Sequence, residues 1–187
     1  MKNVEVELQI RIKDPEKVEE KLRKAGNFIR ERKQKDKYYV TPANNFFDKD
    51  MPTEYLRIRY EEGRDHLNYS HLRFDKKGWL IATDEYETKI EKPEVVEEIF
   101  KKIGLILKVT VVKNRKYFEC GDFEVTLDRV ENLGDFMEVE AKKDFGGEAK
   151  TRKACEQFLK DLGVDYELTK DAGYPRLLYR KLKGNQK

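Results

Sequence analysis

The stretch Val4-Glu5-Val6-Glu7-Leu8-Gln9-Ile10-Arg11-Ile12-Lys13 decides the fold, because apolar and polar side chains alternate along its whole length. Successive side chains of a β-strand point to opposite faces of the sheet. The segment therefore predicts a strand with one apolar face and one polar face. Its polar face starts with two carboxylates and continues with an amide and a guanidinium group. Whether this face meets water or an interior depends on the other strands.

Seven further segments predict strands, from a period of two or from short aromatic and β-branched runs. They are residues 38–40, 55–60, 66–70, 79–91, 109–119, 122–128 and 136–141. Three segments have the apolar spacing of amphipathic helices, with proline or a capping residue before them and glycine after them. These predicted helices are residues 15–26, 93–104 and 148–162.

Charged residues make up 41% of the 187 residues, well above the usual quarter. A thermophile-type charged surface, or a sheet with one solvated face, would account for this excess. Two features favour charges inside instead. The polar faces segregate by strand, with carboxylates on some strands and basic groups on others, and the apolar faces match three helices that need a surface to cover. We therefore expect an α+β fold, a closed antiparallel eight-stranded β-barrel with helices packed outside, because closure also removes the edge strands.

Composition argues against several functional classes. The net charge is only +3, from 40 basic and 37 acidic residues, so no nucleic-acid partner is expected. No apolar run approaches the roughly 18 residues of a membrane span, and the charged start does not resemble a signal peptide. Cys120 and Cys155 have neither zinc spacing nor a disulfide framework. We expect a cytoplasmic protein with one domain over residues 1–180 and a flexible tail over residues 181–187.

A barrel interior lined by both signs of charge suits one kind of ligand. Carboxylates hold hard divalent cations such as Mg²⁺ or Mn²⁺, and arginine and lysine bind phosphate oxygens. A metal-complexed polyphosphate uses both sets at once. His66 and His71, five residues apart, are more typical of a surface or loop than of a ligand pair.

Several short motifs, in this order and spacing, resemble the CYTH superfamily over about residues 4–180. They are Glu5-Val6-Glu7, Gln34-x-Asp36-x-Tyr38, Leu56-Arg57-Ile58-Arg59, Lys113-x-Arg115, Thr126-Leu127-Asp128, Leu133-Gly134-x-Phe136-x-Glu138-x-Glu140 and Tyr174-Pro175-Arg176-Leu177. That superfamily contains class IV adenylyl cyclases, thiamine triphosphatases and inorganic triphosphatases, all built around a triphosphate tunnel. Within it, this chain looks most like members described as class IV cyclases. The last motif resembles an element that closes one end of the tunnel.

The resemblance implies roles for particular residues. The metal-binding set it implies is Glu5, Glu7, Glu138, Glu140 and Asp128. The catalytic set is Glu5, Glu7, Arg59 and Asp128. The phosphate-binding set is Arg57, Arg59, Lys113 and Arg115, with Lys89 and Arg11 as additional candidates. Arg73 is a further basic group that could compensate for the two tunnel lysines that this chain lacks.

Two positions depart from the family pattern. The family motif is usually Glu-x-Glu-x-Lys, and this chain has Gln9 at the lysine position; a second inward lysine is replaced by Ser70. Strand parity puts both positions on the tunnel face, so we expect weaker phosphate binding, a stronger need for metal, and slow turnover or binding alone.

Three functions remain open at this point. The first is a class IV adenylyl cyclase that converts ATP to cyclic AMP and pyrophosphate. The second is a triphosphatase that acts on thiamine triphosphate or inorganic tripolyphosphate. The third is a non-catalytic binder of nucleotide or polyphosphate. The expected partner is a small triphosphate, and a homodimer is possible.

Overall fold

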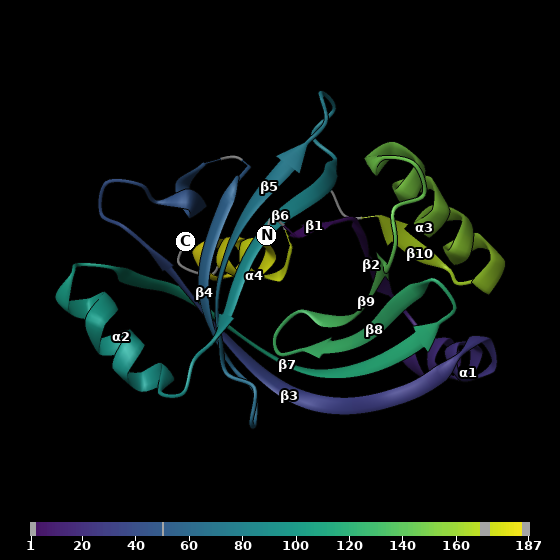
Figure 1. The fold of residues 1–187 in the computed structure, drawn as a ribbon, viewed down its shortest axis with the longest axis horizontal. Helices are drawn as coiled ribbons and strands as arrows, with labels where there is room; N and C mark the ends of the chain where they lie inside the picture. The colour runs from purple at the N-terminus through teal and green to yellow at the C-terminus, as the bar shows by residue number, and fades with distance from the viewer. Residues whose placement is uncertain (1–2, 50, 169–172, 185–187) are drawn as a thin grey trace.

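One antiparallel sheet of ten strands forms the body of the molecule in the computed structural model, which describes residues 3–49, 51–168 and 173–184 (Figure 1). The strands are β1 (Asn3–Glu5), β2 (Glu7–Ile12), β3 (Asn27–Val40), β4 (Glu54–Tyr60), β5 (His66–Phe74), β6 (Leu80–Lys89), β7 (Ile106–Cys120), β8 (Phe123–Val130), β9 (Gly134–Ala141) and β10 (Tyr166–Leu168). The helices are α1 (Pro15–Ala25), α2 (Pro93–Lys102), α3 (Glu148–Leu162) and α4 (Gly173–Gly184), with a 3₁₀ turn η1 at Phe46–Asp48.

The N-terminal segment closes this sheet into a barrel. The strand order is β1-β6-β5-β4-β3-β7-β8-β9-β2-β10, and β1 and β2 are two parts of one segment interrupted at Val6. The first part pairs with β6 and the second with β9, and the Val6 carbonyl accepts a hydrogen bond from the Ala141 amide at 3.2 Å. When β1 and β2 are counted as one strand and the short β10 is left out, the ten strands become eight, and they form a nearly closed barrel. The predicted fold is thus confirmed.

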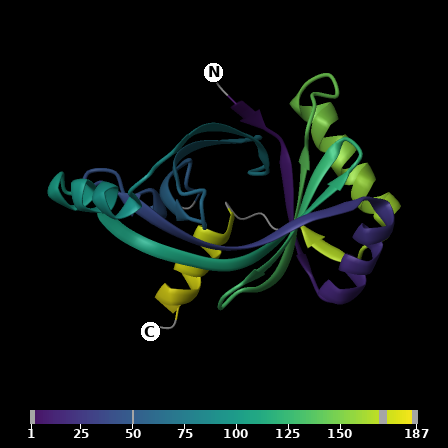
Figure 2. The same ribbon diagram turned by 60° about the horizontal axis from the view of Figure 1, so that its bottom comes forward.

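Helices α1 and α3 cover the apolar outer face of the N-terminal strand, as the alternation predicts (Figure 2). Leu8, Ile10 and Ile12 pack with side chains of both helices in one buried cluster. Helix α1 begins where the Asp14 carboxylate accepts the Lys17 amide at 3.1 Å. It ends at Gly26, where a Cβ atom would lie 2.2 Å from the Glu119 carbonyl oxygen of β7, so only glycine allows this approach. No helix in the described part of the chain is long and apolar enough to span a membrane.

A second apolar cluster fills one end of the barrel interior. It joins aromatic residues of β3, β4 and η1 to the inner side of α4, including Tyr38, Phe47, Tyr55 and Tyr174. Helix α4 was not predicted from the sequence, which placed the start of a flexible tail at residue 181. The helix continues to Gly184, so residues 181–184 are helical; residues 185–187 lie outside the described residues.

Strand β3 is much longer than the predicted segment 38–40. Residues 27–37 read NFIRERKQKDK, in which few apolar residues alternate, so hydrophobic periodicity misses them. The backbone is held as a strand because β3 pairs with β7 from Asn27, opposite Glu119, to Val40, opposite Ile106. This long pair forms one wall of the barrel and carries basic groups toward its interior.

Candidate functional site

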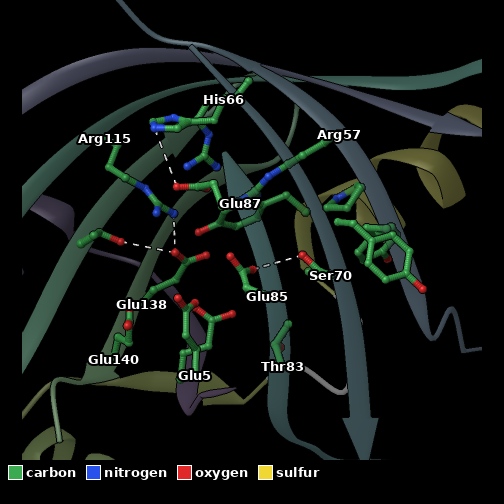
Figure 3. Close-up of a pocket in the computed structure, with 18 of the residues that line it drawn as sticks. Glu5, Arg57, His66, Ser70, Thr83, Glu85, Glu87, Arg115, Glu138 and Glu140 are labelled. Carbon is green, nitrogen blue, oxygen red and sulfur yellow. Dashed lines mark hydrogen bonds and ion pairs between the residues drawn. The ribbon is translucent and has the colours of Figure 1, made fainter. Parts of the chain in front are cut away.

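A cavity of about 1020 Å³ occupies the barrel interior (Figure 3). Both signs of charge line it, as the segregated polar faces predict. The acidic side chains are Glu5, Glu7, Glu61, Glu85, Glu87, Glu124, Glu138 and Glu140. The basic side chains are Arg30, Arg57, Arg59, Arg64, Lys113 and Arg115.

Strand pairing gathers the carboxylates along one wall. Glu140 of β9 lies opposite Glu7 of β2 on one side and opposite Glu124 of β8 on the other. Burial raises the pKa of Glu5 to about 8, with Glu85 and Glu140 adding to the shift. Burial also raises the pKa values of Glu7 and Glu140 to about 8, each reinforced by neighbouring carboxylates. Without a cation, this wall therefore holds protons at neutral pH.

Glu138 behaves differently from its neighbours although it lies on the same wall. Burial alone would raise its pKa, but Arg115 and Lys113 overcome burial and hold it at about 2. Its side chain is bonded to Arg115 and accepts the Gln9 amide at 2.9 Å. Glu138 is therefore a charged link between the carboxylate wall and the basic groups.

Buried carboxylates hold the basic groups in place. Asp36 binds Arg59 through two hydrogen bonds of 2.7 and 2.9 Å and lies 3.8 Å from the Arg57 guanidinium. The Arg59 and Arg57 guanidiniums overcome burial and keep the pKa of Asp36 well below its usual range. Because Asp36 holds Nε and Nη2 of Arg59, the planar guanidinium is fixed in one orientation. Its Nη1 atom is then the nitrogen available to a ligand.

Asp128 does the same for the second basic pair. It binds Arg115 at 2.7 Å through Nε and again through Nη2, accepts the Tyr174 hydroxyl at 2.8 Å, and lies 3.6 Å from the Lys113 amine. Burial and Arg115 lower the pKa of Lys113 to about 8, against the opposing effect of Asp128. Asp36 and Asp128 thus anchor four phosphate-binding candidates.

The structure brings together most of the site residues expected from the sequence. Those that line the cavity are Glu5, Glu7, Glu138, Glu140, Arg57, Arg59, Lys113 and Arg115. Gln9 and Ser70 line it as well, so the strand register assumed for both is right.

Four expected residues do not line the cavity. Arg11 donates to the Leu133 carbonyl at 2.7 Å and lies over the Phe136 ring. Lys89 is exposed at the end of β6, and Arg73 turns outward to Glu148 at 2.6 Å. Asp128 is buried beneath Arg115 rather than facing the cavity. The parity rule gives the face of a strand but not how far along the barrel a side chain lies, which explains the first two cases.

Sequence reasoning missed several cavity residues. Strand alternation puts Glu85 and Glu87 on the polar face of β6, and Glu124 on the same face of β8 as Thr126. The alternation could therefore have identified all three as cavity residues. Arg30 carried no such signal, because β3 was not recognised there; its guanidinium lies 4.0 Å from the centre of the Tyr117 ring.

The two lost lysines are replaced by neutral hydrogen bonds. The Gln9 amide donates to Glu138 at 2.9 Å. The Ser70 hydroxyl donates to Glu85 at 3.1 Å, and the Asn68 amide donates to the same carboxylate at 2.9 Å. Gln9 and Ser70 thus bond to cavity carboxylates without bringing a positive charge into the cavity. A lysine at either position would add one.

The donor set fits a hard divalent cation, although its geometry is not that of a finished metal site. Among the described residues, no three carboxylate, imidazole or thiol groups converge closely enough to hold an ion. The raised pKa values of Glu5, Glu7 and Glu140 nevertheless show a group of buried oxygens short of positive charge. Mg²⁺ accepts such ligands together with water and substrate phosphates.

Comparisons with known proteins agree with this picture. The CYTH domain family model matches residues 3–171. A Methanocaldococcus jannaschii protein named "Putative adenylate cyclase MJ0240" is 34% identical over 163 residues, which cover 86% of this chain and 90% of that one.

Two solved structures share the fold. The PH1819 protein from Pyrococcus horikoshii OT3 matches with a TM-score of 0.80 and 30% identity, over 95% of this chain and 99% of that chain. A Hippeastrum protein, described as a putative adenylyl cyclase with a dominant triphosphatase activity, matches with a TM-score of 0.66 and 15% identity, over 97% and 96% of the two chains.

Proposed function

Because this chain belongs to the CYTH domain family, we propose that it is a metal-dependent enzyme that binds a triphosphate inside its barrel. One observation carries the proposal: carboxylates with raised pKa values and anchored basic groups face one cavity. A metal-bound triphosphate complements both sets, since the cation meets the carboxylates and the phosphate oxygens meet the arginines.

The chain's own residues have separable roles in this proposal. Glu5, Glu7 and Glu140 would hold Mg²⁺ or Mn²⁺, which when bound offsets charge that develops on the phosphates. Arg59 and Arg115 would orient the phosphate chain, because each is fixed by a buried carboxylate. Fixed donors of this kind contribute positioning and electrostatic stabilisation, the two main requirements of phosphoryl transfer.

The apolar end of the cavity favours a triphosphate that carries an organic group. Tyr55, Leu72, Leu80, Tyr174 and Pro175 line that end, next to the apolar cluster under α4. An inorganic triphosphate would leave these side chains uncovered, whereas a nucleoside would bury apolar and aromatic surface there. This feature supports ATP, or a similar organic triphosphate, over tripolyphosphate.

Two reactions fit the same arrangement. In cyclisation, the ribose 3′-hydroxyl oxygen attacks the α-phosphorus, pyrophosphate leaves, and the hydroxyl proton is released. In hydrolysis, water attacks the terminal phosphorus and orthophosphate leaves. We place the class IV adenylyl cyclase reaction first, because the relative with 34% identity is named "Putative adenylate cyclase MJ0240". Triphosphatase activity is the second candidate, and the Hippeastrum likeness, at 15% identity, bears only on the fold.

Product analysis separates these candidates. The protein is incubated with Mg²⁺ and ATP, thiamine triphosphate or tripolyphosphate, and the products are resolved by anion-exchange chromatography. We expect cyclic AMP and pyrophosphate from ATP. Orthophosphate in place of cyclic AMP would assign a triphosphatase. Saturable binding without any product would leave a binding protein, and the lack of both binding and turnover would contradict the proposal.

Restoring the two absent lysines should strengthen phosphate binding. Gln9→Lys places an amine beside Glu138, and Ser70→Lys places one beside Glu85. A hydrogen bond to a charged group contributes about 1.5–3 kcal/mol, so each variant should bind tripolyphosphate about tenfold more tightly and raise any activity. Isothermal titration calorimetry measures the affinity.

His71→Lys is the matched control for this pair. His71 neighbours Ser70 on β5 but faces outward, 3.7 Å from Asp84. A lysine there changes the net charge equally without entering the cavity. Equal gains in all three variants would mean that overall charge, rather than position, determines the affinity.

A further inference from the structure

His66 is a buried polar side chain in the cavity that none of the roles above uses. It is 8% exposed, begins β5, and lines the cavity. Figure 3 shows its ring turned toward Glu87. Sequence spacing alone suggested a surface or loop histidine, and the structure corrects that interpretation.

The imidazole has no hydrogen bond to a described residue. Its Nδ1 atom is enclosed without a partner. Its Nε2 atom lies 3.8 Å from a Glu87 carboxylate oxygen, which is too long for a hydrogen bond. Buried polar groups are nearly always bonded. A ligand in the cavity would give Nε2 the hydrogen-bond partner that Glu87 is too distant to supply, while the enclosed Nδ1 does not reach the cavity.

The position of His66 relative to Arg59 indicates which part of a ligand it meets. The two residues are directly opposite each other on β5 and β4, so their side chains leave the same face with Cβ atoms about 5 Å apart. Arg59 is fixed by Asp36 and faces the cavity. A phosphate bound by Arg59 is therefore within reach of the imidazole.

Strand β5 also gives the direction of the ligand. Its inward side chains that line the cavity run from Leu72, at the apolar end, through Ser70 to His66, and Asn68 between them donates to Glu85. Six residues of a strand span about 20 Å. A nucleoside seated at the apolar end would direct its phosphates toward His66, which makes the last phosphate the nearest one.

We propose that His66 binds the terminal phosphate through Nε2–H and thereby distinguishes triphosphates from diphosphates. This role rests on the proposed function, and on the orientation set by the apolar end. Glu87, whose side chain is 41% exposed, has room to turn away when the phosphate enters. The contact supplies a donor near Arg59 in a cavity from which two lysines are missing.

The test compares MgATP with MgADP by isothermal titration calorimetry. His66→Ala should weaken ATP binding about tenfold, or about 1.4 kcal/mol, and change ADP binding less than about twofold, because ADP lacks the phosphate concerned. His66→Gln keeps an amide donor close to the position of Nε2 and should retain most of the ATP affinity, whereas His66→Asn should not. The outward-facing His71→Ala is the control and should leave both affinities unchanged.

The outcomes separate this inference from the proposed function. Unchanged ATP affinity in His66→Ala, or an equal loss for ATP and ADP, would overturn the role of His66 while triphosphate binding stands. Binding of tripolyphosphate but not of ATP by the unaltered protein would overturn the orientation and this role with it. Failure of the unaltered protein to bind either compound would overturn the proposed function itself. Should His66→Ala not fold, the comparison of His66→Gln with His66→Asn gives the same decision.

Discussion

Replacing Glu5, Glu7 and Glu140 together with glutamine is expected to abolish metal-dependent triphosphate binding while stabilising the metal-free protein. Without their charge the cavity loses its hard anionic ligands. The loss in MgATP affinity should exceed about 100-fold, or about 2.7 kcal/mol. Calorimetric titration with MgATP measures it.

The opposite change in stability follows from the raised pKa values. Each of these carboxyls has a pKa near 8 in the folded protein against a usual value of 4.5. Between those limits the folded state binds more protons than the unfolded state, so its stability falls as pH rises from about 4.5 to 8. Glutamine does not ionise and removes that dependence. At pH 8 and without metal, the triple variant should therefore melt at a higher temperature than the unaltered protein.

Adding Mg²⁺ completes this test. In the unaltered protein the cation must displace the protons, so its stabilising effect should grow between pH 5.5 and 8; in the triple variant it should vanish. A triple glutamine substitution at the exposed residues Glu62, Glu94 and Glu98 removes the same charge elsewhere. If that control loses Mg²⁺ stabilisation equally, or if the cavity variant keeps it, the carboxylate wall is not the metal site.

Much of this site could be predicted because strands make the face of each residue readable. Alternation alone put Glu5, Glu7, Arg57 and Arg59 on inward faces, and the cavity confirms each of them. The apolar faces predicted where helices pack, as Leu8 and Ile10 show beside α1 and α3. These predictions rest on a local period, which the sequence displays directly.

What escaped prediction depends on distant partners. The charged segment before Tyr38 is a strand because β7 pairs with it. Arg11 and Lys89 lie on strands of the barrel, yet their positions along those strands place them outside the cavity. The alternation of side chains does not show how far along the barrel a residue lies. It also does not show that a carboxylate such as Asp128 is covered by an arginine and kept from the cavity.

Asp128 is the clearest example of a residue whose surroundings the sequence did not reveal. Its replacement should have a large effect on the stability of the protein. The sequence interpretation made it a metal ligand and a catalytic group. In the structure it is 2% exposed and binds Arg115, Lys113 and Tyr174. Asp128→Asn should therefore lower the free energy of unfolding by about 3–5 kcal/mol, the usual result of removing one partner from a buried ion-pair network. That is a large part of the 5–15 kcal/mol that is typical of whole domains.

Urea denaturation measures this loss, and Asp135→Asn is its control. Asp135 pairs with Arg129 at 2.9 Å, but the Arg129 side chain is 66% exposed, so the control should change stability by less than about 1 kcal/mol. If Asp128 were a metal ligand instead, the variant would keep its stability and lose its response to Mg²⁺. Retained stability combined with a lost Mg²⁺ response would contradict the structural role.

The pH dependence of phosphate binding gives a second, independent readout of Asp128. Burial and Arg115 lower the pKa of Lys113 to about 8, and Asp128 opposes that effect. Without Asp128 the pKa falls further, so the amine is neutral over more of the range between pH 7 and 8. Triphosphate affinity in Asp128→Asn should therefore drop at a lower pH than in the unaltered protein, while the dependence on Mg²⁺ persists because the carboxylate wall is intact. A lysine that loses its charge earlier, in a protein that still needs metal, is the result expected if Asp128 acts through the basic groups and not through the cation.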